Sequence, residues 1–212
     1  DDGGSLTDLE KKVMASAQRS RTSYMDAASS IAKLGLNARD AFGSMDEVIA
    51  FQELINKQFI IGGASVQEQQ AAMIQLTQAM ASGVLRGEEL NSVFEQAPGI
   101  IQSIADYLDV SIGEIRAMAA EGQLTADVVK NAMFAAADDI ETKFSNMPKT
   151  WGQIWIGMKN KALSIFNPIL NKVNQVANSE KFTQVTNGVI NGLAGIASVA
   201  TVVLDLLIGG AA

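Results

Sequence analysis

Four motifs of the form Ser/Thr-x-x-Glu mark the starts of α-helices along this 212-residue sequence. In such a motif the hydroxyl accepts a hydrogen bond from the backbone N–H three residues later, and the glutamate accepts one from the backbone N–H of the first residue. Each motif precedes a run in which apolar residues recur every three or four positions, which indicates an amphipathic helix. The chain is therefore predicted to be all-α. The motifs are Thr7 with Glu10, Ser44 with Glu47, Ser65 with Glu68, and Ser111 with Glu114.

Glycine residues predict where the first helices end. The first predicted helix covers residues 8–33. The second follows Ser44 and ends at Gly62-Gly63, and the third follows Ser65 and ends at Gly83. Glycine closes helices because it adopts left-handed backbone without a steric penalty. The short link between the second and third helices predicts that they pack antiparallel as a hairpin.

The middle of the chain predicts short helices and then a longer one. Residues 87–122 contain several breaks, among them Pro98-Gly99. A longer helix starts at Thr125 or Asp127 and is closed by Pro148. We expect two parts, residues 1–148 as a helical domain and residues 149–212 as a long kinked helix followed by an apolar helical segment. The predicted architecture is a multi-helix bundle with helical hairpins and a long C-terminal helical segment. The stripe of the longer helix is Val129, Met133, Ala136, Ile140 and Phe144.

Residues 151–176 carry apolar side chains separated by steps of four or three, mostly alternating. This mean period of about 3.5 to 3.6 is typical of the seam of a coiled coil or helical bundle. Pro168 lies within the run and predicts a kink or a break. Either the stripe covers the rest of this domain, or it meets copies of itself or a partner helix. The stripe consists of Trp151, Trp155, Met158, Ala162, Ile165, Ile169, Val173 and Val176.

The segment 182–208 is nearly free of charge. No charged residue occurs from Phe182 to Leu204, and Asp205 then precedes three apolar residues. A membrane-spanning helix needs about 20 mainly apolar residues, and the first part of this segment is rich in Asn, Gln and Thr. We therefore favour a buried helix, or one that waits to insert, over an ordinary transmembrane helix. Membrane contact through residues 182–208 supports an alternative function as a membrane-active, pore-forming helical protein.

The residue types limit the chemistry that is open to this chain. It contains no cysteine and no histidine, which removes the thiolate and imidazole ligands of zinc and histidine-based nucleophilic triads. The many acids stand mostly at helix starts, where capping explains them, so no pair is singled out for glycoside hydrolysis. We predict that the chain is not an enzyme and has no catalytic, cofactor-binding or metal-binding residue.

Two segments imitate ligand-binding motifs. Residues 102–121 resemble a DNA-binding helix-turn-helix, but Arg116 is their only basic residue among four acids. A helix that reads DNA needs cations that contact phosphates, and the chain has a net charge of −7. We therefore expect a helical corner and no specific nucleic-acid binding. Residues 83–87 form a glycine-flanked loop without the Gly-Lys-Ser/Thr signature of a phosphate loop, and we expect a simple connection.

The order of several short segments resembles the tape measure domain of phage and prophage tail tape measure proteins. The resemblance covers about residues 8–200. No single segment is a chemical signature, and the order and spacing of the segments carry the resemblance. Such proteins are usually far longer, and both ends of this sequence look cut, so we expect a fragment of a longer chain. The segments are ASAQRS (15–20), FQELINKQF (51–59), LTQAMASG (76–83), LRGEEL (85–90), QAP (96–98), VSIGE (110–114), LTAD (124–127) and MPKTW (147–151).

This resemblance implies a structural and assembly role. Tape measure proteins lie in the lumen of the growing tail tube, whose subunits polymerise around them until the ruler is used up. The implied partners are the tail tube protein, tail assembly chaperones and baseplate or tail-tip proteins, together with self-association. The implied locations are the virion tail and, during assembly, the host cytoplasm. At infection such a protein leaves ahead of the DNA and aids genome delivery through the envelope. The family offers no catalytic residues to transfer.

Overall fold

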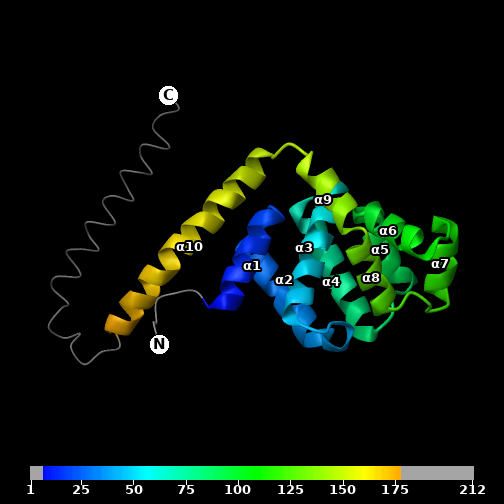
Figure 1. Cartoon of the computed structure of the whole chain (residues 1–212), viewed down its shortest axis with the longest axis horizontal. Coiled ribbons are helices and arrows are strands. Elements are labelled where there is room, and N and C mark those ends of the chain that lie inside the picture. The colour runs from blue at the N-terminus through cyan, green and yellow to red at the C-terminus, as the bar shows by residue number, and fades with distance from the viewer. Residues whose placement is uncertain (1–6, 178–212) are drawn as a thin grey trace. The chain divides into compact units, whose positions relative to one another are not determined.

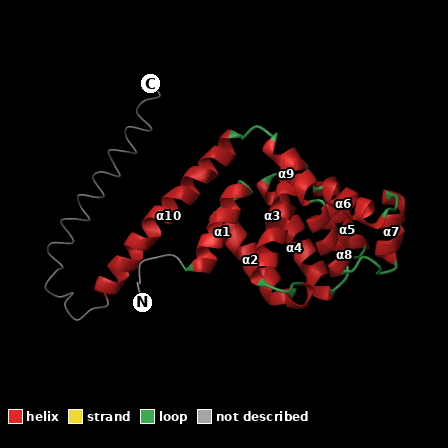
Figure 2. Cartoon of the chain, in the orientation of Figure 1, coloured by secondary structure: helices red, strands yellow, loops and turns green. Residues whose placement is uncertain are grey.

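A computed structural model describes residues 7–177, with side chains for these residues except 88, 89 and 166–177. All regular structure in this part is helical (Figures 1 and 2), which confirms the predicted all-α multi-helix bundle. The helices are α1 (Asp8–Arg19), α2 (Tyr24–Asn37), the 3₁₀ turn η1 (Arg39–Ala41), α3 (Met45–Ile61), α4 (Val66–Ser82), α5 (Gly87–Gln96), α6 (Pro98–Leu108), α7 (Ile112–Ala120), α8 (Ala126–Ala135), α9 (Ala137–Ser145) and α10 (Trp151–Ala177).

All four predicted N-caps are confirmed. The side chains of Thr7, Ser44, Ser65 and Ser111 each accept a hydrogen bond from the backbone N–H three residues later. Three of the motifs form the complete reciprocal pair. At Ser44 the glutamate instead accepts from the N–H of Gly43, at 2.8 Å. Hydrogen bonds from Ser65, first from its side chain and then from its backbone, lower the pKa of the Glu68 carboxyl.

Helix α3 lies at the centre of the fold (Figure 1) and contacts α1, α2, α6, α8 and α9. Each residue from 51 to 60 is buried, so this helix is covered on all sides. Such a helix belongs to the interior of a domain. Phe51, Ile55 and Phe59, which are spaced four residues apart along one face, are fully buried. Among the buried polar residues of α3, Glu53, Lys57 and Gln58 form hydrogen bonds inside the protein.

Residues 20–23 interrupt the predicted first helix, so the single helix over residues 8–33 is wrong. The hydroxyl of Ser20 donates to the carbonyl of Ser16 at 2.8 Å, and Arg21 has a left-handed backbone with φ of 53°. Ser23 then caps α2 by accepting a hydrogen bond from the N–H of Asp26 at 3.1 Å. The apolar periodicity continues across this corner and hid the cap. The break allows α1 and α2 to pack against each other.

The predicted helix that ends before Pro148 is also two helices. At Ala136 the backbone (φ −86°, ψ 2°) ends α8, and α9 begins at the next residue. Helix α8 packs mainly on α6, whereas α9 packs on α3. The bend therefore lets one apolar stripe reach two partners. The buried members of this stripe are Val129, Met133, Ile140 and Phe144.

The structure also differs from the expected hairpin partner and excludes a break at Pro168. Helix α4 makes its main contacts with α2 and α5 rather than with α3, so the predicted hairpin has the wrong partner. Helix α10 continues through Pro168 to Ala177, so the helix does not break there, and the predicted kink stays a prediction. A proline removes one helical hydrogen bond, and here the helix tolerates that loss.

The chain divides into two compact units. One comprises Leu6–Ser164 and includes the first turns of α10, and the rest of α10 from Ile165 onward belongs to the other. The division expected after residue 148 stays a prediction. The apolar segment 182–208 lies outside the described residues. Within residues 7–177, no helix has both the length and the apolar character needed to cross a membrane.

Candidate functional site

A chain of charged side chains connects α1, α3 and α9 inside the first unit. The carboxylate of Glu53 accepts hydrogen bonds from Arg19, with Nε at 3.0 Å from Oε1 and Nη2 at 2.8 Å from Oε2. The ammonium of Lys57, one turn further along α3, donates to Glu53 Oε1 at 2.8 Å and also to Glu141. The Lys57 side chain is only 3% exposed. Four charges from three helices are thus paired in alternating order, which we call the ion cluster (Arg19, Glu53, Lys57 and Glu141).

The ion cluster keeps Glu53 ionised in the interior. Burial by itself raises the pKa of a carboxyl, but hydrogen bonds from Arg19 and Lys57, and their positive charges, outweigh this effect. The pKa of Glu53 therefore lies below its ordinary value of 4.5. The carboxylate of Glu53 in turn raises the pKa of the Arg19 guanidinium through their hydrogen bonds. The two buried members of the cluster, Glu53 and Lys57, are joined by a hydrogen bond of 2.8 Å.

The ring of Phe144, near the end of α9, packs against two cations. The guanidinium carbon of Arg21 lies 4.3 Å from the centre of its ring, and the ammonium of Lys57 lies 5.5 Å away. Arg21 also donates a hydrogen bond to the carbonyl of Phe144, at 3.3 Å. A cation over an aromatic face is attracted by the ring quadrupole. Phe144 thus holds the end of α9 against the corner between α1 and α2.

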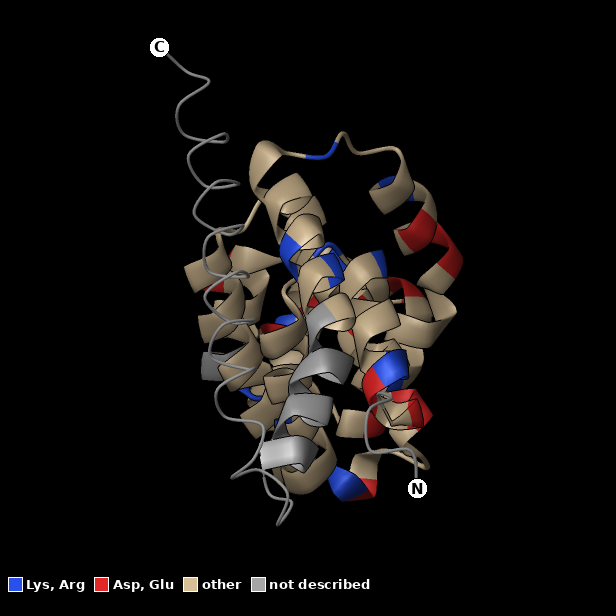
Figure 3. Ribbon diagram, turned by 90° about the vertical axis from the view of Figure 1, so that its left-hand side faces the viewer, with Lys and Arg blue, Asp and Glu red and all other residues tan. Residues whose placement is uncertain are grey.

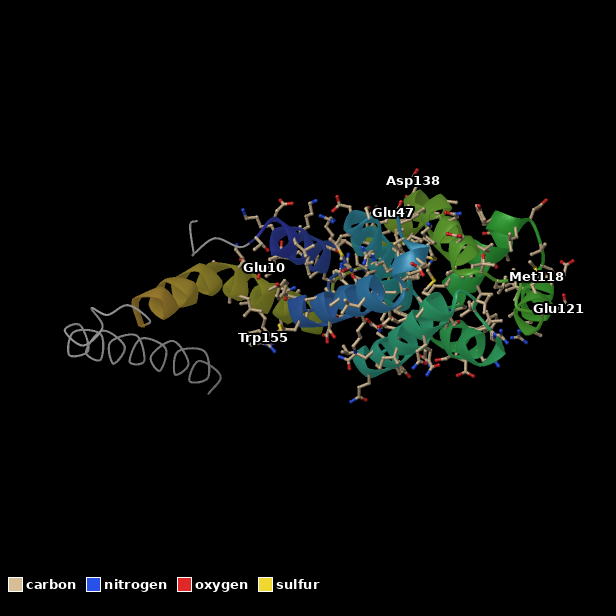
Figure 4. The ribbon with its side chains drawn as sticks, turned by 90° about the horizontal axis from the view of Figure 1, so that it is seen from below. Glu10, Glu47, Met118, Glu121, Asp138 and Trp155 are labelled. Atoms are coloured by element: carbon tan, nitrogen blue, oxygen red, sulfur yellow. The ribbon has the colours of Figure 1, made fainter. Side chains whose placement is uncertain are left out.

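A groove with a volume of about 540 Å³ lies above the ion cluster, between α1 and α9, with α3 as its floor. Its floor is partly apolar, with Ile49 and Leu54, and Asp138 of α9 points outward at its edge (Figure 4). Charges of both signs lie close together on α1 (Figure 3). Glu53 and Glu141 are already bound to cations. Among the side chains that the structure describes, no group of three or more acidic residues is placed to hold a metal ion. The ion pairs of this arrangement hold α1, α3 and α9 together.

The first turns of α10 are attached to the domain by one buried side chain. Asn160 is only 1% exposed. Its amide Nδ2 donates to the carbonyl of Thr22 at 2.7 Å, and its Oδ1 accepts from the N–H of Tyr24 at 2.9 Å. Both partners flank the N-cap of α2, so Asn160 satisfies backbone groups that the turn leaves unpaired. A buried backbone group without a partner costs free energy, so these two hydrogen bonds stabilise the attachment of α10.

Replacing Asn160 by alanine is expected to release the start of α10. Two hydrogen bonds are lost and two backbone groups are exposed, which lowers the free energy of local opening by about 2 kcal/mol. Backbone N–H groups between residues 155 and 163 should then exchange roughly 30-fold faster, because about 1.4 kcal/mol corresponds to tenfold. Hydrogen exchange with mass spectrometry measures this. Asn37 is exposed at the end of α2, and its replacement by alanine should leave α10 unchanged. Equal exchange in both variants would contradict the role of Asn160.

The opposite side of α10 presents large apolar side chains to the surface. Trp151 is 84% exposed, Trp155 is 54% exposed and Met158 is 58% exposed. Trp155 extends from α10 at the outside of the molecule (Figure 4). Exposed apolar patches of this kind are typical of surfaces that another molecule covers. The first part of the predicted seam therefore does not cover its own domain.

The comparison with protein families decides what kind of chain carries these features. The family model described as tape measure protein matches residues 1–172, which is most of the chain. The chain belongs to the tape measure protein family. This membership makes it a structural protein of a phage tail. Searches of curated proteins and of solved structures give no match.

In this tape measure protein, the segment that imitates a helix-turn-helix forms a helical corner. Helices α6 and α7 pack together across a turn in which Asp109 has a left-handed backbone with φ of 54°. Arg116 lies over the ring of Phe94 in α5, with its guanidinium carbon 4.6 Å from the ring centre. The one base of the segment therefore packs within its own domain. The absence of specific nucleic-acid binding stays a prediction.

The glycine-flanked loop is a connection, as expected. Gly83 ends α4 with a left-handed backbone. The N–H of Leu85 donates to the carbonyl of Leu124 at 2.7 Å, and the N–H of Ala126 donates to the carbonyl of Gly83 at 2.8 Å. These bonds tie the loop to the start of α8. They use backbone groups of this tape measure protein that would otherwise be open to a ligand.

The ion cluster and the role of Asn160 are not evident from the sequence. Glu53 and Lys57 are four residues apart, a spacing typical of an exposed ion pair on a helix. Apolar residues surround Glu53 and Lys57 on more than one side of α3, and this pattern could have indicated that the two charged side chains are buried. In the sequence, Asn160 is only a polar residue within an apolar run, and nothing there indicates its two hydrogen bonds to the start of α2. No residue was predicted to be catalytic or to bind a cofactor or a metal, and this too stays a prediction for the tape measure protein.

Proposed function

We propose that this tape measure protein is the ruler that sets tail length and the scaffold around which the tail tube is assembled. The observation that carries this proposal is the family match over residues 1–172. We further propose that the chain has no enzymatic activity, in keeping with a structural family. Its proposed place is the lumen of the tail tube, and the host cytoplasm during assembly. The genome-delivery role also belongs to this proposal.

The geometry of an α-helix supports the ruler. Each residue adds about 1.5 Å along the axis, so length in sequence becomes length in space. Helix α10 has 27 residues, which corresponds to about 40 Å. Helices α1 to α9 fold back on one another, so extra residues in that unit add little length. Long single helices such as α10 are therefore the parts of the chain whose length can set the length of the tail.

The exposed side of α10 supports the proposed partners. Trp151, Trp155 and Met158 are open to the surface in the isolated chain. Apolar surface of this kind is stabilised when another molecule removes it from water. The tail tube protein, tail assembly chaperones, baseplate or tail-tip proteins, and further copies of this chain are the proposed protein partners.

Duplicating residues 151–177 in the gene that encodes this chain is expected to lengthen the tail. Each duplication adds 27 residues of helix and should add about 40 Å, and a second should add the same again. Electron microscopy of purified tails measures this. The matched control inserts 27 flexible residues after Gly122, in the turn between α7 and α8, and should leave tail length unchanged. Tails of constant length after both changes, or equal lengthening by both, would contradict the ruler.

A further inference from the structure

We propose that the start of α10 is a binding site for anionic membrane surfaces, on which the helix lies flat with its apolar side in the headgroup region. The site, which we call the α10 face, consists of Trp151, Trp155, Met158 and Ala162, flanked by Lys159 and Lys161. This inference deepens the genome-delivery part of the proposed function. It is independent of the ruler, since tail length and lipid binding are measured separately.

The attachment of α10 determines which side of the helix is free. Asn160 follows Trp151 by nine residues, which is two and a half turns of about 3.6 residues each, so the two side chains point in opposite directions. Asn160 is buried against the corner between α1 and α2, whereas Trp151 is the most exposed large apolar residue in the part of the chain with described side chains. Trp155, Met158 and Ala162 follow at steps of four, three and four, on the side of Trp151. The domain therefore holds the polar side and presents the apolar one.

The charges of α10 are the reverse of those of the rest of the chain. From residue 149 to residue 177 there are four lysines and no acidic residue, in a protein with a net charge of −7. Lys159 and Lys161 stand on either side of the α10 face, about 80° from its centre at 100° per residue. Lys159 also lies over the ring of Trp155, with its ammonium 5.8 Å from the ring centre. At physiological salt charges are screened within about 8 Å, so a surface touching α10 meets these lysines first.

This combination fits a lipid surface at genome delivery, when the protein partners proposed for tail assembly no longer cover the face. Lysines at the edges of an apolar stripe can lay their stems along it and extend their ammonium groups to lipid phosphates. A basic polar side with tryptophan on the apolar side is typical of helices that lie in the membrane interface. The chain has two tryptophans, and both lie on this face within five residues. The indole ring favours the headgroup region because it is apolar with one hydrogen-bond donor. The face contains no acceptor that would require a partner of fixed shape.

The two tryptophans make the binding visible without a label. The full chain is mixed with vesicles of phosphatidylcholine alone, or with one third phosphatidylglycerol, and tryptophan emission and acrylamide quenching are measured. Anionic vesicles should shift the emission to shorter wavelength and reduce quenching, at least tenfold more strongly in partition coefficient than neutral vesicles. Raising the salt from 0.1 M to 1 M should weaken the binding, because the screening length falls from about 10 Å to about 3 Å.

Two variants with the same net charge separate the α10 face from the rest of the chain. Met158→Glu places a charge on the face and should lower the partition coefficient at least tenfold. Gln153→Glu places the same charge elsewhere on α10, where Oε1 of the side chain accepts from the N–H of Thr150 at 3.2 Å, a bond that glutamate preserves. It should bind like the wild type. Circular dichroism confirms that both variants fold. Three results would overturn the proposal: no binding of the wild type, equal binding of both variants, or an emission shift that follows protein concentration without vesicles, which indicates self-association.

Discussion

Replacing Glu53 by alanine is expected to lower the free energy of unfolding by about 3 kcal/mol. Removing one partner of a buried ion pair leaves an uncompensated charge, which typically costs about 3–5 kcal/mol. The lower end applies because Arg19 is 57% exposed and can turn to solvent, and because Lys57 keeps Glu141. Urea unfolding followed by circular dichroism measures the change. A loss below about 1 kcal/mol would show that the ion cluster does not support the packing of α1 on α3.

The double variant Glu53→Leu with Lys57→Met tests whether charge is the cause. It removes both buried charges at similar volume, and such replacements are often neutral or stabilising. We expect its stability to lie within about 1.5 kcal/mol of the wild type. A double variant that is less stable than Glu53→Ala would show that shape, rather than unpaired charge, explains the single variant.

The same residue gives the fold a dependence on pH. The pKa of Glu53 is lower in the folded protein than its ordinary value of 4.5. The stabilisation is therefore present above pH 4.5 and is lost as the pH falls through the lowered pKa, because the unfolded chain then binds more protons. The double variant should lose less stability between pH 6 and pH 3 than the wild type.

Replacing Phe144 by alanine is expected to lower the free energy of unfolding by about 3–5 kcal/mol, which is typical of a buried aromatic residue. The side chain is almost fully buried, and its ring lies close to both Arg21 and Lys57. Its loss leaves a cavity where α9 meets the corner between α1 and α2. Thermal and urea unfolding measure the effect.

Phe144→Leu separates apolar burial from the attraction of the two cations. Leucine keeps most of the buried area but offers no ring to Arg21 and Lys57, so a loss of about 1–2 kcal/mol is expected. If leucine is as stabilising as phenylalanine, the cations contribute nothing through the ring. If alanine costs less than about 1 kcal/mol, Phe144 is not part of the core.

Features that depend on neighbours in sequence could be predicted. An N-cap needs only a hydroxyl and a backbone N–H three residues later, and Thr7, Ser44, Ser65 and Ser111 all act in this way. The buried stripe of α3 follows from spacing alone. The corner at residues 20–23 was missed although Ser23 is a cap, because apolar positions recur through it without a change of period.

Features that depend on distant residues could not be predicted. Arg19 and Glu53 are 34 positions apart, and Lys57 and Glu141 are 84 apart. Charged residues are rarely buried unless paired, and no local pattern shows that a partner is present. The division of one stripe at Ala136 also depends on where α3 and α6 lie, which the sequence around Ala136 does not contain.

The corner between α1 and α2 has a consequence for synthesis on the ribosome. Arg21 donates a hydrogen bond to the carbonyl of Phe144, which is 123 residues later in the chain. The N–H of Tyr24 donates to the side chain of Asn160, which is 136 residues later. At about 5–20 residues per second, the first helices spend on the order of ten seconds outside the ribosome before their partners are made. During this interval the carbonyl of Thr22 and the N–H of Tyr24 have no partner, whereas α3 and α4, which are made sooner, already contact α2. The corner is therefore among the last parts of this domain to gain its hydrogen bonds during synthesis.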